Sequence, residues 1–133
     1  MIDVKAFLKE NPCGILATQD GEKIRTRMIQ FLFFEGRKAY FATGKGKSVS
    51  NQLKINPRVS FFTMAPDFDT TVSIDGNAFF SDDLQIKSKA LALNSVFEQV
   101  FVHPDNPDLE VFYIDPQEVR YYTRTDNMKT IKF

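Results

Sequence analysis

Short segments of β type, separated by turn residues, fill most of the first eighty positions of this 133-residue chain. They are rich in β-branched and aromatic residues, and dipeptides typical of tight turns, such as Asp20-Gly21, lie between them. This succession predicts antiparallel strands rather than alternating βαβ units. The expected strands are 13–18, 23–34, 38–43, 58–65 and 70–81, with shorter ones at 111–114 and 119–123.

Three helical segments are expected among these strands. A short helix follows Asp3 as its cap, a second begins with Ser48 as its N-cap, and a longer one covers roughly 84–101. Because strands are in the majority, the order predicts a mainly β protein, a β-barrel with a few helices that holds one ligand at most. No repeat, linker or low-complexity segment marks a boundary, so we expect a single domain over residues 1–133.

The composition argues against several classes of partner. Seventeen Lys and Arg balance seventeen Asp and Glu, so the chain lacks the positive field that drives binding to nucleic acid or an anionic membrane. No apolar run approaches the ~18 residues of a membrane-spanning helix, and the first residues lack the apolar core of a signal peptide. A single cysteine, Cys13, excludes an internal disulfide. We expect a cytoplasmic protein with neither nucleic acid nor membrane as a partner.

The balanced net charge conceals a basic region that could bind a compact anion. Residues 20–58 hold nine Lys or Arg against three acids, whereas 65–118 hold eleven acids against two lysines. In the basic region, the loop 43–48 offers small residues, two lysines, two hydroxyls and the N–H groups of a helix start, a combination that suits a phosphate monoester. The loop lacks the spacing of a P-loop. An ordinary solvated basic turn is the alternative.

Two arginines lie close to that loop in the expected topology. Arg25 and Arg27 share one face of a strand by period-two alternation, where their forked donors could grip a phosphate or a carbonyl edge. Alternating arginines on a surface strand are the simpler alternative. In a meander, the strand that carries Arg27 lies beside the strand that ends at Thr43, which would bring both features to one barrel mouth.

The sequence offers no catalytic constellation and no metal site. His103 is the only histidine and lies in a Pro- and Asp-rich loop, so we interpret it as a solvated residue. Cys13 is interpreted as a small buried residue rather than a nucleophile. The fourteen phenylalanines exceed what a small barrel can bury, and an apolar homodimer interface would absorb the remainder.

Several short motifs follow one another over about residues 12–80. They are Pro12-x-Gly14-x-Leu16-Ala17-Thr18, Arg25-x-Arg27-Met28-Ile29, Tyr40-Phe41-Ala42-Thr43, Lys47-Ser48, Gln52-Leu53-x-x-Asn56-Pro57-Arg58-Val59 and Val72-x-Ile74-x-Gly76-x-Ala78. In their order and spacing, rather than in any one of them, these motifs resemble one known family, the pyridoxamine 5′-phosphate oxidase-like flavin-binding proteins.

The resemblance implies a six-stranded antiparallel split β-barrel that binds FMN in a groove between the two subunits of a homodimer. Residues 27–30 would lie along the flavin ring and ribityl chain, with main-chain groups of Met28 and Ile29 at the polar edge of the ring. Ala42 and Thr43 would line the phosphate end, and Lys47 and Ser48 would hold the phosphate. The full implied cofactor set is Arg25, Arg27, Met28, Ile29, Gln30, Ala42, Thr43, Lys47, Ser48 and Gln52.

Departures from the family pattern bear on the reaction. Leu32 stands where the vitamin oxidase has a substrate-binding lysine, and Thr71 stands where it has a flavin-contacting glutamine. We therefore expect an FMN-dependent oxidoreductase that takes a small-molecule substrate or electron donor, and not a true pyridoxamine phosphate oxidase. The alternatives are a non-catalytic module of the same fold that binds or senses flavin, deazaflavin or heme, and a structural dimer without a cofactor.

Overall fold

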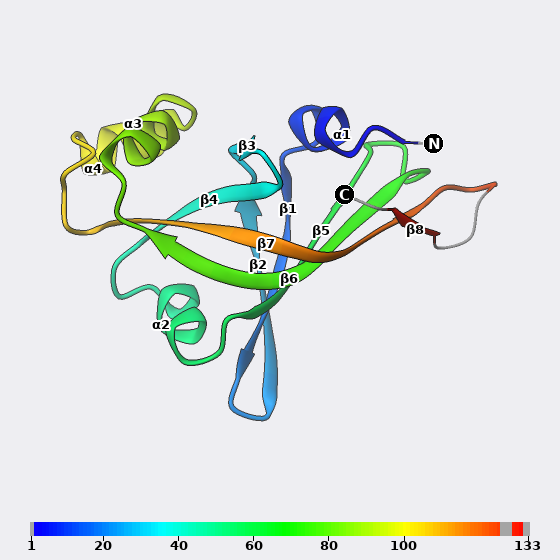
Figure 1. Ribbon diagram of the computed structural model, residues 1–133, viewed down its shortest axis with the longest axis horizontal. Helices are drawn as coiled ribbons and strands as arrows, with labels where there is room; N and C mark the ends of the chain where they lie inside the picture. The colour runs from blue at the N-terminus through cyan, green and yellow to red at the C-terminus, as the bar shows by residue number, and fades with distance from the viewer. Residues whose placement is uncertain (1, 126–128, 132–133) are drawn as a thin grey trace.

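One curled antiparallel sheet with helices at its periphery makes up the protein (Figure 1), of which the computed structural model describes residues 2–125 and 129–131. The mainly β class is as expected, but the sheet has eight strands rather than the six that the resemblance implies. The elements are α1 (Val4–Glu10), β1 (Cys13–Asp20), β2 (Lys23–Gln30), β3 (Phe33–Glu35), β4 (Lys38–Gly44), α2 (Ser48–Ile55), β5 (Arg58–Met64), β6 (Thr71–Ser81), α3 (Leu84–Ala92), α4 (Ser95–Phe101), β7 (Leu109–Tyr122) and β8 (Lys129–Ile131).

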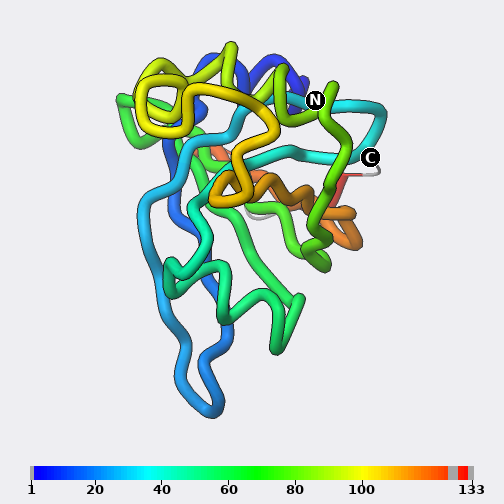
Figure 2. The backbone as a smooth tube through the Cα atoms, turned by 90° about the vertical axis from the view of Figure 1, so that its left-hand side faces the viewer, coloured from blue at the N-terminus to red at the C-terminus, as the bar shows by residue number. Residues whose placement is uncertain are grey.

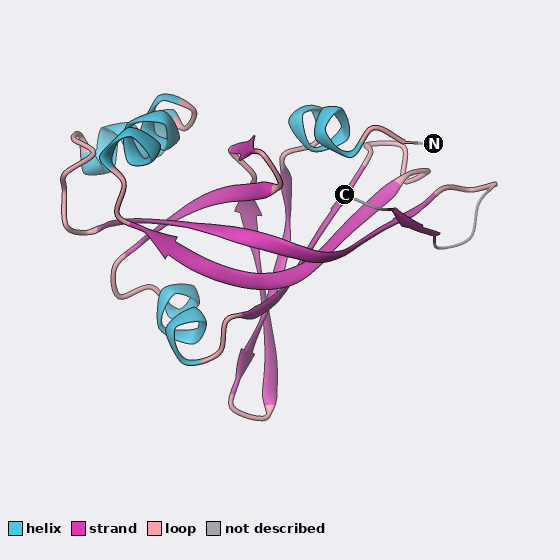
Figure 3. Ribbon diagram, viewed as in Figure 1, coloured by secondary structure: helices cyan, strands magenta, loops and turns pink. Residues whose placement is uncertain are grey.

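The strand order is β2-β1-β5-β6-β7-β4-β3, with β8 paired to β7 outside this path. In Figure 3 the long strands β6 and β7 cross the middle of the molecule, and the helices lie around the strands. The hairpin of β1 and β2 projects away from the rest (Figure 2). Strands β2 and β3 are nearly consecutive in the chain, yet they occupy the two ends of the path.

The expected strand 23–34 is wrong because the chain changes pairing partner at Phe31 and Leu32. The N–H of Phe31 donates to the carbonyl of Pro12 at 2.7 Å, on the β1 side, whereas the N–H of Leu32 donates to the carbonyl of Tyr40 at 3.0 Å, on the β4 side. Two adjacent residues therefore bond to opposite ends of the sheet path, and we call them the seam.

Aromatic side chains fill the inside of the curled sheet. Phe41 lies with its ring centroid 4.9 Å from that of Phe61 and 5.5 Å from that of Phe112, and all three side chains are completely buried. Full burial of such a side chain stabilises the fold by about 1.5–3 kcal/mol. Cys13, expected to be buried, is exposed at the start of β1.

The expected strands 111–114 and 119–123 form one long strand, β7, with an irregularity in its middle. The register between β6 and β7 shifts between Asp75 and Gly76, and Gly76 pairs with Pro116. A Cβ at position 76 would lie 2.1 Å from the carbonyl oxygen of Asp115, so only glycine fits there. Proline is tolerated at a bulge, where the ladder loses a hydrogen bond in any case.

The expected helix 84–101 is two helices, α3 and α4. The side chain of Asn94 accepts a hydrogen bond from the N–H of Phe97 at 3.0 Å, which makes Asn94 the N-cap of a new helix. A second apolar cluster lies under α3 and joins Ile86, Ala90 and Leu91 to Tyr40. Within residues 2–125 and 129–131, no helix has the length and apolar character needed to cross a membrane.

Candidate functional site

A cavity of about 480 Å³ opens between β2, β4, the start of α2, and α4. Its volume lies in the ~300–1,000 Å³ range of small-molecule sites. Of the residues expected from the sequence to hold a cofactor, all but Arg25 and Gln52 line this cavity. The lining residues are Arg27, Met28, Ile29, Gln30, Ala42, Thr43, Gly44, Lys47, Ser48, Val49, Asn94, Val96, Phe97, Val100 and Phe101.

The expectation that β2 and β4 are neighbours in a meander is wrong, although both strands reach one cavity. They lie near opposite ends of the hydrogen-bonded path, separated by β1, β5, β6 and β7. The curl of the sheet and the seam at residues 31–32 bring them together. Arg27 and Thr43 therefore meet through the closure of the sheet and not through direct pairing.

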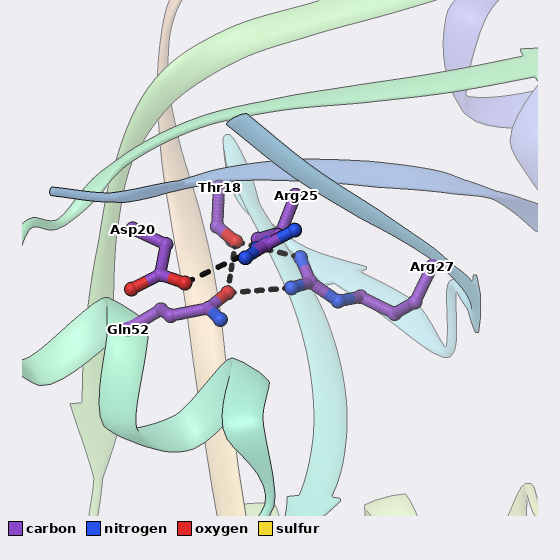
Figure 4. A network of polar contacts seen from close by, with 5 residues as sticks. All are labelled: Thr18, Asp20, Arg25, Arg27 and Gln52. Atoms are coloured by element: carbon purple, nitrogen blue, oxygen red, sulfur yellow. Dashed lines mark hydrogen bonds and ion pairs between the residues drawn. The ribbon is translucent and has the colours of Figure 1, made fainter. Parts of the chain in front are cut away.

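Arg27, on β2, is held in place by partners on two elements, β1 and α2 (Figure 4). Its Nη1 donates to the carbonyl oxygen of Leu16 at 3.1 Å and to Thr18 Oγ1 at 2.8 Å, and its Nη2 donates to Gln52 Oε1 at 2.6 Å. The Thr18 hydroxyl donates to the same Gln52 oxygen at 2.5 Å. We call Thr18, Arg27 and Gln52 the arginine network.

The arginine network leaves a cation with unused donors at the cavity. A guanidinium has five N–H groups, and the contacts above use three of those of Arg27. Among the described residues, no carboxylate lies within ion-pair distance of Arg27. Burial lowers the pKa of Arg27 from its ordinary value, yet an arginine remains charged in proteins. The site therefore offers an anion a positioned positive charge.

Arg25 and Gln52 have other places in the structure. Arg25 Nε lies 3.1 Å from Asp20 Oδ2, in a half-exposed ion pair near the tip of the β1–β2 hairpin. Gln52 lies on α2 and accepts hydrogen bonds from both Arg27 and Thr18, so it positions the guanidinium and does not line the cavity.

The loop before α2 forms the second cationic part of the cavity. Lys47, and not the expected Ser48, is the N-cap of α2, and it makes no side-chain capping hydrogen bond. The N–H groups of the first turn therefore lack a side-chain cap among the described residues, and such groups favour anions. Lys47 lines the cavity, whereas Lys45, two residues earlier, does not.

Glu110 on β7 binds two residues of α2 and does not itself line the cavity. Its carboxylate accepts hydrogen bonds from the Ser50 hydroxyl and from Lys54 Nζ, the latter at 2.7 Å. Burial acts to raise the pKa of Glu110, but the hydrogen bonds from Lys54 and Ser50, with the charges of Lys54 and Lys45, outweigh it and lower the pKa. The position of the Lys47–Ser48 turn therefore depends on an ionised Glu110.

Helix α4 forms the wall that the sequence reasoning missed. Phe97 and Phe101 line the cavity with their ring centroids 5.9 Å apart, and Val96 and Val100 are 62% and 64% exposed. The missed signal was the second apolar pair, Val96 and Val100, which makes the helix face wider than packing against the sheet requires.

A hydrogen bond ties this wall to the sheet, since Asn94 Nδ2 donates to Gln30 Oε1 at 3.0 Å. At the other end of the helix, the ring of Phe101 approaches Gly44, where a Cβ would lie 3.4 Å from the Phe101 Cζ. Elsewhere, His103 is exposed, and no group of three His, Cys, Asp or Glu side chains arranged to hold a metal occurs in residues 2–125 and 129–131.

The sequence and the fold are similar to those of bacterial proteins. General stress protein 26 of Bacillus subtilis is 27% identical over 116 residues, which cover 85% of this chain and 81% of that protein. A crystal structure of a nimC/nimA family protein from Clostridium acetobutylicum has a TM-score of 0.85 at 23% identity, over 96% of this chain and 88% of the other.

Two further structures of the same fold have names that mention a cofactor. The heme binding protein from Mycobacterium smegmatis has a TM-score of 0.80 at 17% identity, over 96% of this chain and 55% of that one. A structure named F420 reductase has a TM-score of 0.70 at 20% identity, over 90% of this chain and 98% of the other. The family model described as pyridoxamine 5′-phosphate oxidase matches residues 2–123, and the chain therefore belongs to this family.

Proposed function

We propose that this protein binds FMN in the cavity between β2, β4, α2 and α4 and acts as an FMN-dependent oxidoreductase. The observation that carries the proposal is that two kinds of lining meet in that one cavity. Arg27, Lys47 and an uncapped helix start supply positive charge and N–H donors, whereas α4 supplies an apolar face. FMN needs both kinds of lining, since it has a phosphate at one end and a large flat ring at the other.

Each of the two kinds of lining would bind a different part of the cofactor. Lys47 and the hydroxyls of Thr43 and Ser48 would hold the phosphate, together with the N–H groups at the start of α2. Backbone groups of Met28 and Ile29 would meet the polar edge of the ring. When bound, the flavin supplies the hydride or electron transfer, while the protein binds it, orients it and limits its contact with water.

The reaction is proposed to differ from pyridoxamine phosphate oxidation. Leu32, at the family's lysine position, is 9% exposed and belongs to an apolar cluster, so it cannot pair with a phosphorylated substrate there. A small-molecule substrate or electron donor of another kind is therefore proposed. Anaerobic addition of NADH or NADPH tests turnover, because bleaching of the flavin absorbance is expected for an oxidoreductase with a nicotinamide donor.

The alternative is a binding or sensing module without turnover. The similar structure named for heme binding favours it, since the same fold serves a protein that is named for binding a cofactor and not for a reaction. The two proposals differ in what the purified protein holds and in whether it reacts. Extraction of the cofactor identifies flavin, deazaflavin or heme, and a flavin that neither nicotinamide reduces would favour the alternative.

We also propose that two copies of the chain assemble. Met28 pairs across the strands with Ile15, and Ile15 with Phe62, so an apolar row crosses three strands on the outer face of the sheet. Met28 is 64% exposed and also lines the cavity, so a second copy on this face would cover the cofactor. Light scattering on a sizing column should give twice the chain mass, and Met28→Glu should halve it. A wild-type mass of one chain would contradict the proposal.

The test of FMN binding compares two lysines of one loop and two ligands. Lys47→Gln should weaken FMN binding by about tenfold, the effect of one charge-assisted contact, and leave riboflavin, which lacks the phosphate, unaffected. Lys45→Gln is the matched control, since Lys45 lies in the same loop but does not line the cavity. Protein that is colourless as purified and has no affinity for FMN would end the proposal.

A further inference from the structure

A second cavity, of about 320 Å³, lies beside the cofactor cavity and has a different character. Its floor is the four-residue stretch Phe31–Phe34, and its sides come from α1 and from α3 with the residue that follows it. Neighbouring residues of the chain line the two cavities at two places. Gln30 and Asn94 line the first cavity, and Phe31 and Leu93, next to them in the sequence, line the second. The lining residues are Lys5, Lys9, Phe31, Leu32, Phe33, Phe34, Lys89 and Leu93.

The floor of this cavity is apolar and fixed by packing. Phe31 and Phe33 are 3% and 7% exposed. The ring of Phe33 stacks on Tyr40 with centroids 4.8 Å apart and planes 12° apart, and Phe31 packs against Phe34 at 4.8 Å. A flat apolar group entering the cavity would therefore meet rings that are already in place, which limits the entropy lost on binding.

The rim of this cavity is cationic. Among the described residues, no carboxylate lies within ion-pair distance of Lys9 or Lys89. Lys89 Nζ lies 4.4 Å from the centroid of the Phe33 ring, and Lys5 Nζ lies 5.7 Å from that of Phe34. Such a contact gains little when the cation itself is exposed to solvent, about 0.5–1 kcal/mol. An anion that also contacts the ring would add to this interaction.

We propose that this second cavity binds an aromatic carboxylate. Its ring would pack against Phe33 and Phe34, and its carboxylate would accept hydrogen bonds from Lys9 and Lys89. The proposal rests on the second cavity alone and does not depend on which cofactor fills the first.

The lining explains why a carboxylate fits better than a phosphate. No hydroxyl or amide side chain lines the second cavity, and the backbone N–H groups of Phe31 and Leu32 are already bonded to Pro12 and Tyr40. Phosphate sites in proteins usually combine cations with such N–H and hydroxyl donors. A carboxylate has a smaller charge, and ammonium groups alone can satisfy it.

The test compares a charged probe with its neutral counterpart. Calorimetric titration of the full chain, in the state in which it purifies, should show 2-naphthoate binding about tenfold tighter than 2-naphthalenemethanol, because only the carboxylate meets the lysines. Lys9→Gln and Lys89→Gln should each weaken 2-naphthoate binding about threefold and together about tenfold, as expected for partly exposed ion pairs. Binding of the alcohol should not change.

Two controls make the result specific. Lys87→Gln removes a charge from the same helix without touching the cavity and should leave 2-naphthoate binding unchanged, and Lys89→Arg should keep most of it. In NMR spectra, 2-naphthoate should shift the backbone amide resonances of Phe31–Phe34 more than those of the β1–β2 hairpin. Equal affinity for the acid and the alcohol, or an equal loss in Lys87→Gln, would overturn the proposal.

Discussion

The two walls of the cavity between β2, β4, α2 and α4 are built in different ways. On the sheet side, Arg27 is bonded to Thr18, which is 1% exposed, and to Gln52 of α2, so the wall is part of the hydrogen-bonded fold. On the other side, α4 has no fully buried residue, and the cavity-lining side chains of Val96 and Val100 are more than half exposed. The wall that carries charge is fixed by the chain itself, whereas the apolar wall is left partly open.

The difference indicates what each wall needs from a ligand. Cationic and donor groups must be positioned before an anion arrives. If they are not, the solvation of the charge and the entropy of its mobile side chain offset much of its attraction for the anion. Apolar contacts are less directional, so a helix that is incompletely packed can still provide them once a ring or a second copy covers it. The following predictions separate the two walls.

The largest effect is expected at the arginine network. Arg27→Met should weaken FMN binding by about 1.5–3 kcal/mol, roughly 10- to 150-fold, because a hydrogen-bonded charge is lost. Quenching of flavin fluorescence measures the change. Arg25→Met is the matched control and should bind FMN almost as the wild type does, since Arg25 pairs with Asp20 and does not line the cavity. Equal losses in both variants would mean that the charge acts only at long range.

A smaller effect is expected on α4. Val100→Asp places a carboxylate on the apolar wall and should weaken both FMN and riboflavin binding by about 1–2 kcal/mol, roughly tenfold. Gln99→Asp adds the same charge to the same helix at a residue that does not line the cavity, and it should have little effect. Because Val100 is 64% exposed, neither change should alter the free energy of unfolding by more than about 0.5 kcal/mol. A loss confined to FMN would contradict the assignment of α4 to the ring.

Acid should loosen the sheet side before the α4 side. Since the pKa of Glu110 is lowered in the folded protein, its stabilising effect is fully present above its ordinary value of 4.5 and is lost as the pH falls through the lowered folded value. Glu110→Gln should therefore lower the free energy of unfolding by about 1 kcal/mol at neutral pH and by progressively less in acid. Urea unfolding at several pH values measures the difference. Parallel pH dependences of the wild type and Glu110→Gln would refute this role of Glu110.

The smallest effect is a gain in stability at the end of α4. Val102 has φ +68° and ψ −53°, and the N–H of His103 donates to the carbonyl of Phe101 at 2.7 Å across it, a strained turn for a β-branched residue. Val102→Gly should raise the free energy of unfolding by up to about 1 kcal/mol, partly offset by the freedom of glycine in the unfolded chain. Val100→Gly, inside the helix, should lower it by a similar amount. A loss in both variants would argue against strain at Val102.

The sheet wall could be predicted from the sequence because its signals are local. Period-two alternation placed Arg25 and Arg27 on one face, and the small, basic and hydroxyl residues of 43–48 follow one another directly in the chain. Charged side chains must also be solvated or paired, so their presence within a β pattern already restricts what they do.

The remaining features depend on contacts between distant segments. The run Phe31-Leu32-Phe33-Phe34 is uniformly apolar, so nothing in it marks the change of pairing partner. Val96 and Val100 make the apolar face of α4 wide, but the sequence does not tell whether such a face meets a core or lines a cavity. Two short strands, 111–114 and 119–123, were expected on either side of Pro116, and the continuity of β7 depends on the bulge at which Pro116 pairs with Gly76 of β6.

The seam also decides where the chain could tolerate new ends. The N–H groups of two neighbouring residues, Phe31 and Leu32, bond to segments near opposite ends of the strand order. The peptide bond between these residues therefore holds the two ends of the curled sheet together. A circular permutant opened there would free both ends of the sheet at once, and the cavity between β2, β4, α2 and α4 would widen. Ends placed at 66–69, in the connection between two strands that already pair along their length, would leave the closure intact.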